Sequence, residues 1–201
     1  MRWYVIRHAR KEQGEFYNPM LRHQDEPISA EGREQARKLA DYMADKPISA
    51  MYVSAYARTL QTAASAAERL GIKPVIDERL NEIDNGVVGA LTEDEFGAAY
   101  PVEYAAYLRR SADFRFPGGE TGTEVRERIA AFEREKRVQH AGQDILVVAH
   151  DGLIRSWMCY LMELPVYRRA DFQIDFCGLM EIDYQEEYGR WKLIRFNHPC
   201  G

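Results

Sequence analysis

The sequence predicts an α/β protein: a three-layer sandwich whose mostly parallel central sheet is flanked by helices on both faces, with a small helical insertion. Short apolar segments typical of buried strands alternate with longer segments whose apolar residues recur at helical spacing. The chain has 201 residues, of which 46% are hydrophobic, and this is enough for one sizeable core. We therefore expect one domain over residues 1–201, with residues 90–116 as a helical cap insertion.

Composition narrows the possible functions. The net charge of −5 argues against a nucleic-acid-binding protein, which normally presents a basic face. No apolar segment approaches the roughly 20 residues that a membrane helix needs, and a strand that begins at residue 2 leaves no room for a signal peptide. The three cysteines have the spacing of neither a disulfide framework nor a zinc site, and Cys159 is expected in the core. We expect a cytoplasmic protein without nucleic-acid or membrane partners.

Capping chemistry and periodicity define the elements of the first half. Ser29 is a suitable N-cap for a helix with one apolar face. Residues 9–28 are polar and rich in turn formers, and a loop this long is uncommon unless it is functional. The expected elements in chain order are a strand to residue 6, a loop over 9–28, a helix from 29 to about 45, a strand over 48–53, a helix ending at 70, a strand over 73–76 and a loop over 79–89.

The second half contains two capping boxes. Thr92 and Thr121 are each followed three residues later by glutamate, so both are expected to begin helices. Pro101 should divide the helical region 92–112. The remaining elements are a helix to about residue 139, a buried strand over 145–149, a helix after His150, and two or three tail strands from Phe172 onward, including 172–176, with a hairpin near Gly189.

Basic residues stand where several strands end. An apolar strand leads into Arg7 and His8, a second leads to Arg58 at the beginning of a helix, and a third leads into His150. If these strands are neighbours, the four side chains meet at one edge of the sheet, where open α/β sheets bind their ligands. Helix N-termini at the same edge point backbone N–H groups toward an anion.

These residue types suit phosphoryl transfer. The transition state spreads negative charge over the phosphoryl oxygens, and the forked donors of Arg7 and Arg58, together with a protonated or donor His150, match those oxygens. A neutral His8 can attack phosphorus, because the ordinary histidine pKa is about 6.5. Glu82 is the best-placed carboxylic acid to protonate the leaving group and later to activate water, although Asp77, Glu78 and Asp84 are acidic neighbours.

Six motifs in order resemble the histidine phosphatase superfamily, the phosphoglycerate-mutase-like proteins. The resemblance spans residues 2 to about 160 and implies a phosphohistidine on His8, phosphate binding by Arg7, Arg58 and His150, an acid at Glu82, and neither metal nor other cofactor in the phosphatase branch. The motifs are Arg7-His8, Asp25-Glu-Pro-Ile-Ser29 with Gly32 and Gln35-Ala36, Ser54-Ala-Tyr-Ala-Arg58-Thr-Leu-Gln-Thr-Ala63, Leu80-Asn-Glu82 with Gly86, Pro117-Gly-Gly-Glu-Thr121 and Val148-Ala-His150-Asp-Gly-Leu-Ile-Arg155.

The loop after His8 departs from the family pattern. Ala9 replaces the usual glycine, which is tolerable if its backbone φ is negative. Arg10, Lys11 and Gly14 replace an acidic or amide residue, a hydroxyl residue and an asparagine, respectively. The resemblance implies that loss of the hydroxyl and the asparagine removes two phosphate contacts. We expect Asn18, Arg10 or Lys11 to substitute for them as substrate ligands.

Other residues have plainer interpretations. Asp151 is expected to cap its helix, with its backbone N–H available to phosphate. His23, His140 and His198 are expected at the surface. The aromatic residues of the region 96–116 either pack a helical hairpin or cover the pocket, where Arg109, Arg110 and Arg115 would attract an anionic substrate.

The favoured function is a metal-independent phosphatase acting on a small phosphomonoester, which makes the chain a phosphoric monoester hydrolase. The alternatives are a phosphoglycerate mutase, a phosphohistidine-protein phosphatase, and a non-catalytic module that binds a phosphorylated ligand. The expected partner is a small phosphorylated metabolite, and the tail strands leave a homodimer open.

Overall fold

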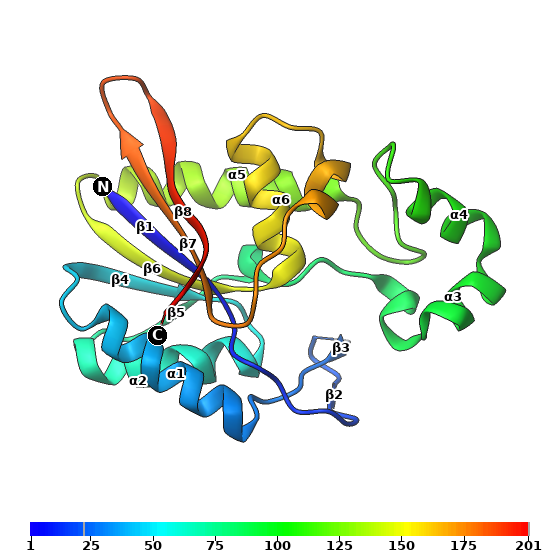
Figure 1. Cartoon of the computed structure of the whole chain (residues 1–201), viewed down its shortest axis with the longest axis horizontal. Coiled ribbons are helices and arrows are strands. Elements are labelled where there is room, and N and C mark those ends of the chain that lie inside the picture. Colours follow the sequence, from blue (N-terminus) through cyan, green and yellow to red (C-terminus); the bar gives the residue numbers. More distant parts are fainter. Residues whose placement is uncertain (22, 201) are drawn as a thin grey trace.

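A central six-stranded sheet organises the computed structural model, which describes residues 1–21 and 23–200 (Figure 1). The strand order is β5–β4–β6–β1–β7–β8. The four strands β1 (Arg2–Arg7), β4 (Ile48–Val53), β5 (Val75–Ile76) and β6 (Asp144–Ala149) are parallel. The last two, β7 (Gly178–Gln185) and β8 (Arg190–Pro199), form an antiparallel hairpin, and β7 also runs antiparallel to β1. The predicted α/β fold is confirmed.

Alternating side chains of the strands form two cores. Tyr4 and Ile6 of β1 pack with residues of α1 (Ala30–Met43) and α2 (Ala57–Leu70) on one face of the sheet. Trp3 and Val5 pack on the other face with residues of α5 (Gly122–Gln139) and α6 (Asp151–Leu161). Successive side chains of β1 point to opposite faces, and both faces are covered by helices. Nearly every residue of the strand is therefore buried and apolar.

The caps predicted at Ser29, Thr92 and Thr121 are present. The Ser29 hydroxyl accepts a hydrogen bond from the backbone N–H of Gly32 at 3.1 Å and begins α1. Thr92 begins α3 (Glu93–Ala99) and Thr121 begins α5, each through a complete capping box. Pro101 stands in the first turn of α4 (Pro101–Arg109), where its missing N–H costs nothing. The starts of these helices were therefore predicted correctly.

The region 93–109 projects from the sheet. In Figure 1, α3 and α4 lie beyond the edge at which β1, β4 and β6 end. Phe96 is buried, and its ring lies 5.3 Å from that of Tyr104 and 6.0 Å from that of Tyr107, centroid to centroid. These contacts support the interpretation of a packed helical hairpin. The division into one domain with a cap over 90–116 stays a prediction.

Three expectations about the chain were wrong or incomplete. Residues 172–176 do not form a strand; they connect the 3₁₀ helix η3 (Val166–Asp171) to β7. The loop over 9–28 contains a small antiparallel hairpin of β2 (Tyr17–Asn18) and β3 (His23–Gln24). His140 is buried rather than exposed: its Nδ1 donates a hydrogen bond to Oε1 of Gln143, and its Nε2 is hydrogen-bonded to the hydroxyl of Tyr52.

The remaining short elements lie between β5 and α3. They are the 3₁₀ helices η1 (Glu78–Leu80) and η2 (Gly86–Ala90), within the region expected as a loop. Cys159 is buried, as expected, and so are Cys177 and Cys200; all three are free thiols. Across the described ranges, the helices are too short or too polar to cross a membrane.

Candidate active site

The register of the parallel strands brings the two histidines together. Arg7 pairs with Ala149 across β1 and β6, so the next residues, His8 and His150, leave the sheet side by side. The backbone N–H of His8 donates to the carbonyl of Ala149 at 2.9 Å and continues the ladder by one bond. The imidazole rings lie 5.2 Å apart, centroid to centroid, and both are almost fully buried. The expected meeting of these two residues at one sheet edge is therefore observed.

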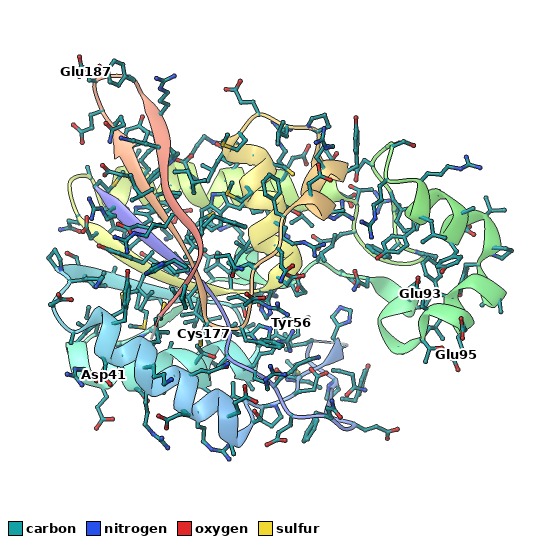
Figure 2. The ribbon with its side chains drawn as sticks, viewed as in Figure 1. Asp41, Tyr56, Glu93, Glu95, Cys177 and Glu187 are labelled. Atoms are coloured by element: carbon teal, nitrogen blue, oxygen red, sulfur yellow. The ribbon has the colours of Figure 1, made fainter. Side chains whose placement is uncertain are left out.

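Aromatic rings hold the two arginines in place. The Arg7 guanidinium lies 4.1 Å from the centroid of Phe176 and donates to the carbonyl of Ile174 at 2.6 Å. The Arg58 guanidinium, in the first turn of α2, lies 4.2 Å from the centroid of Tyr56. Tyr56, labelled in Figure 2, lies at the end of the sheet that faces the β2–β3 hairpin. Stacking on an aromatic face leaves the edges of each guanidinium available to an anion.

Both arginines keep unused donor capacity. Arg58 is 6% exposed, yet its contacts to the Gln24 carbonyl and the Glu26 carboxylate are both long, at 3.5 Å. Among the described residues, the Nε atoms of Arg7 and Arg58 are buried and have no hydrogen-bond partner. Buried donors of this kind normally find a partner, so two of them close to the paired histidines suit a bound anion.

Both histidines are neutral at pH 7. Burial lowers the pKa of His8 well below its usual value of 6.5, and the nearby Arg58 charge lowers it further. Burial, Arg58 and His8 lower the pKa of His150 in the same direction. The Nδ1 atom of His8 lies 2.8 Å from the carbonyl oxygen of Ala9 and must be the protonated nitrogen, because a carbonyl only accepts. The Nε2 atom of His8 consequently carries the free electron pair.

Ser54 positions His150. Its hydroxyl oxygen lies 2.7 Å from Nε2 of His150 and 2.8 Å from the hydroxyl of Thr59, and it accepts the backbone N–H of Tyr56 at 3.2 Å. The Nδ1 atom of His150 is buried without a partner among the described residues. A tautomer with its proton on Nδ1 needs Ser54 to donate to Nε2, and the hydroxyl chain from Thr59 permits that arrangement. The sequence pattern alone did not assign this role to Ser54, although the residue opens a motif that was recognised.

The carboxylate of Glu82 lies at the N-terminus of α6. It accepts the backbone N–H groups of Ile83, Leu153 and Gly152 at 2.9, 3.0 and 3.2 Å. Negative charge is favoured at this end of a helix. The neighbouring acids are engaged elsewhere: Asp77 pairs with Arg79, and Asp84 accepts the backbone N–H of Gly86. Among these loop acids, Glu82 is thus the one that contacts the start of α6, next to His150.

The expectation that Asp151 caps α6 was wrong. Asp151 is the first residue of the helix, His150 is the N-cap residue, and neither side chain caps the backbone. The Asp151 carboxylate instead lies 3.8 Å from Arg7 and 3.0 Å from Arg155, and Glu82 satisfies the exposed N–H groups of the helix. Substrate binding by Asp151 stays a prediction.

The candidate ligands in the first loop have protein partners. Arg10 pairs with Glu31 at 3.0 Å, and Asn18 donates to Asp25 at 3.0 Å. Lys11 pairs with Glu26, the carboxylate that also faces Arg58. Their role as substrate ligands therefore stays a prediction.

Ala9 fits its position without strain. It is fully buried, and its backbone φ is not positive. Its backbone N–H donates to the hydroxyl of Thr62 at 2.9 Å. Loss of the usual glycine therefore leaves the loop after His8 intact.

Metal ligands do not gather in the described part of the chain. No group of three or more histidine, cysteine, aspartate or glutamate side chains there is arranged to hold a metal ion. The basic groups around His8 belong to Arg7, Arg58 and His150, and cationic groups attract anions rather than metal ions.

Comparison with known proteins gives consistent matches over nearly the whole chain. The family profile described as histidine phosphatase superfamily (branch 1) matches residues 3–198. Phosphoserine phosphatase 1 of Hydrogenobacter thermophilus is 28% identical over 98% of this chain and 92% of its own length. An Enterobacter protein named a probable phosphoglycerate mutase is 29% identical over 91% of this chain and 85% of its own length.

Solved structures share the fold. A mycobacterial glucosyl-3-phosphoglycerate phosphatase superimposes with a TM-score of 0.83 at 23% identity, covering 98% of both chains. The α-ribazole phosphatase of Shigella flexneri gives a TM-score of 0.82 at 22% identity, covering 99% of this chain and 97% of its own. At these identities the likeness concerns the fold alone.

Proposed function

The chain belongs to the histidine phosphatase superfamily (branch 1), and from this premise we propose that it hydrolyses a small phosphomonoester through a phosphohistidine intermediate on His8. The family and the phosphatases among the relatives agree with the predicted class, a phosphoric monoester hydrolase. One observation carries the proposal for the intermediate. A buried, neutral His8 with a free Nε2 lies beside His150 and near two arginines, Arg7 and Arg58, that keep unused donors.

The first step is attack of Nε2 of His8 on phosphorus. The bond from Nε2 to phosphorus forms while the bond from phosphorus to the ester oxygen breaks, and the hydrogen bond to the Ala9 carbonyl stabilises the charge that develops on the ring. Arg7, Arg58 and the Nδ1–H of His150 stabilise the charge on the equatorial phosphoryl oxygens. No divalent metal is needed in this scheme, because these three groups provide the positive charge and the hydrogen bonds.

Glu82 acts first as general acid and then as general base. As a carboxylic acid it protonates the departing ester oxygen, and as a carboxylate it then takes a proton from the water that attacks the phosphohistidine. Its hydrogen bonds from the backbone N–H groups of Gly152 and Leu153 hold the carboxyl group at the start of the helix that follows His150. Hydrolysis returns His8 to its neutral state and releases inorganic phosphate.

The substrate class is a small phosphorylated metabolite. The relatives are named for phosphoserine and phosphoglycerate chemistry, and two solved neighbours are named for glucosyl-phosphoglycerate and α-ribazole phosphate. A phosphoglycerate mutase reaction would use the same intermediate but return the phosphoryl group to an organic acceptor. The measured ratio of inorganic phosphate to transferred phosphate separates the two reactions.

Hydrolysis of p-nitrophenyl phosphate in the presence of EDTA tests the proposal. We expect turnover by the wild type and background release by His8→Ala. Release at background level by both proteins would contradict hydrolysis of this substrate. Tight binding of phosphate esters without turnover would then favour the non-catalytic binding module.

A further inference from the structure

A small cavity next to the candidate active site is lined by arginines and aromatic rings. It lies where η3, α6 and the segment after α4 meet, in the region between α6 and α4 in Figure 1. Its volume is about 40 Å³, which suits a group of a few atoms. We call it the Arg155–Arg169 cavity; its principal lining residues are Tyr107, Arg110, Phe114, Arg155, Tyr167 and Arg169.

The cavity is connected to the candidate phosphate site through one carboxylate. Asp151 contacts Arg7 with one carboxylate oxygen and Arg155 with the other, at 3.8 and 3.0 Å. A substrate whose phosphate reaches Arg7 therefore has Arg155 within the span of a short organic chain. The N-terminal turn of α6, which carries both Asp151 and Arg155, fixes this spacing.

Positive charge in the cavity exceeds the negative charge available to neutralise it. Arg155 has only Asp151 as an ion-pair partner, shared with Arg7, and its buried Nε has no partner among the described residues. Arg169 forms no ion pair within the described ranges, and its hydrogen bond to the Val166 carbonyl is long, at 3.4 Å. Burial lowers the pKa of Arg169; the nearby Asp113 carboxylate opposes this effect, and the Arg155 charge adds to it.

The nearest remaining acid is already committed. Asp113 faces Arg169, but one of its oxygens accepts the backbone N–H groups of Phe114 and Gly122. Its other oxygen accepts the backbone N–H and the hydroxyl of Thr123. These four hydrogen bonds occupy the four lone-pair sites of a carboxylate. Arg169 can therefore accept another anion without breaking an existing pair.

We propose that the Arg155–Arg169 cavity binds a carboxylate of the substrate, and thus that the enzyme prefers phosphomonoesters that carry a carboxylate close to the phosphate. The proposal rests on the phosphatase function proposed above. A guanidinium fork matches the two oxygens of a carboxylate, and a volume of about 40 Å³ suits a group of this size. The rings of Tyr107, Phe114 and Tyr167 restrict the entry of water and so strengthen the ion pair.

Two matched pairs of substrates test the proposal. In the first pair, 3-phosphoglycerate is compared with glycerol 3-phosphate; in the second, O-phosphoserine is compared with O-phosphoethanolamine. Within each pair the principal difference is the carboxylate. We expect the wild type to have a kcat/KM at least roughly tenfold higher for the carboxylate member of one pair or both, the effect of one charge-assisted hydrogen bond. Equal values within both pairs would overturn the proposal.

Substitution of Arg169 tests whether the Arg155–Arg169 cavity causes the carboxylate preference. Arg169→Gln should reduce the carboxylate preference at least tenfold, mainly through a higher KM, and Arg169→Lys should give an intermediate loss because it keeps the charge without the fork. The control is Arg168→Gln, since Arg168 lies on the same 3₁₀ helix and already pairs with Asp171. A preference unchanged in Arg169→Gln, or lost equally in Arg168→Gln, would overturn the proposal.

Failure of the underlying function gives a different result. A wild type that hydrolyses none of the four esters, and releases no p-nitrophenol from p-nitrophenyl phosphate, contradicts the phosphatase itself. A wild type that hydrolyses them without preference contradicts only the carboxylate site. Thermal unfolding of each variant is measured alongside, and should Arg169→Gln not fold, the wild-type preference and Arg169→Lys decide the outcome.

Discussion

At the scale of single residues, the surroundings of His8 suit the nucleophilic role that we propose for this imidazole at neutral pH. Burial and two arginines keep the ring neutral, and the Ala9 carbonyl selects the tautomer with a free Nε2. The same arginines that lower the pKa of His8 are suited to hold the phosphoryl group. The same arginines therefore serve both proposed roles, because they keep His8 neutral and offer donors to a phosphoryl group.

Arg58→Ala should lose two to three orders of magnitude in kcat/KM. A preorganised donor to the charge of the transition state is worth roughly 3–4 kcal/mol, and Arg58 is the buried guanidinium with the fewest close partners at this site. The control is Arg69→Ala, because Arg69 is an exposed residue of the same helix that pairs with Asp41. A loss below about tenfold for Arg58→Ala would rule out the proposed role.

Glu82→Gln should slow substrates in proportion to the basicity of their leaving groups. An alkyl phosphate needs a proton on its departing oxygen, whereas p-nitrophenolate leaves with little assistance. The ratio of kcat values for the two substrates in wild type and variant measures the effect. Equal slowing of both substrates would contradict the role of Glu82 as general acid and would indicate that it only caps α6.

At the scale of elements, the N-terminus of α6 follows directly after β6 and contacts the Glu82 carboxylate. Gly152 permits this contact because an added Cβ atom would lie 2.7 Å from the side chain of Ile83 and 2.8 Å from Oε1 of Glu82. The glycine is needed for close approach rather than for an unusual backbone angle, since its φ lies outside the positive region.

Gly152→Ala should therefore displace the Glu82 carboxyl group. We expect a drop in kcat that is larger for alkyl phosphates than for p-nitrophenyl phosphate, and a destabilisation of about 1–3 kcal/mol from overpacking. Gly89→Ala is the control, because its added Cβ atom would meet only the Asn85 side chain, at 3.8 Å. Unchanged kinetics in Gly152→Ala would show that the contact with Glu82 is not needed.

Much of this element-level arrangement could be predicted from the sequence. Ser29, Thr92 and Thr121 gave the helix starts because capping is local chemistry. The meeting of His8 with His150 followed from the rule that parallel strands end at one edge.

Features that depend on tertiary contacts could not be predicted. Phe176 lies 168 residues after His8, and its segment was expected as a strand, so nothing local indicated that its ring covers Arg7. The cap of α6 was assigned to Asp151 because that residue is adjacent to the helix start, whereas Glu82 arrives from a distant loop. The burial of His140 depends on the distant Tyr52 in the same way.

At the scale of the whole molecule, the two buried histidines should make stability depend on pH. In the folded protein the pKa values of His8 and His150 lie well below 6.5, whereas in the unfolded chain they return to about 6.5. Below this pH the unfolded state binds more protons than the folded state, so the free energy of unfolding falls as the pH falls.

The expected loss is up to roughly 1 kcal/mol per histidine for each pH unit below about 6.5. Urea denaturation at pH 7.5 and pH 5.5 measures it, with the double variant His8→Asn, His150→Asn as the comparison. We expect a smaller decrease in the double variant. An identical pH dependence in both proteins would contradict the neutral state assigned to the two histidines.

The phosphohistidine on His8 is the central claim, and intact mass spectrometry tests it most directly. The protein is mixed rapidly with a panel of phosphorylated metabolites and quenched in alkali, which preserves phosphohistidine. We predict a mass gain of one phosphoryl group in the wild type and in His198→Ala, and none in His8→Ala. A gain that persists in His8→Ala, or no gain from any substrate that the wild type hydrolyses under these conditions, would contradict the account.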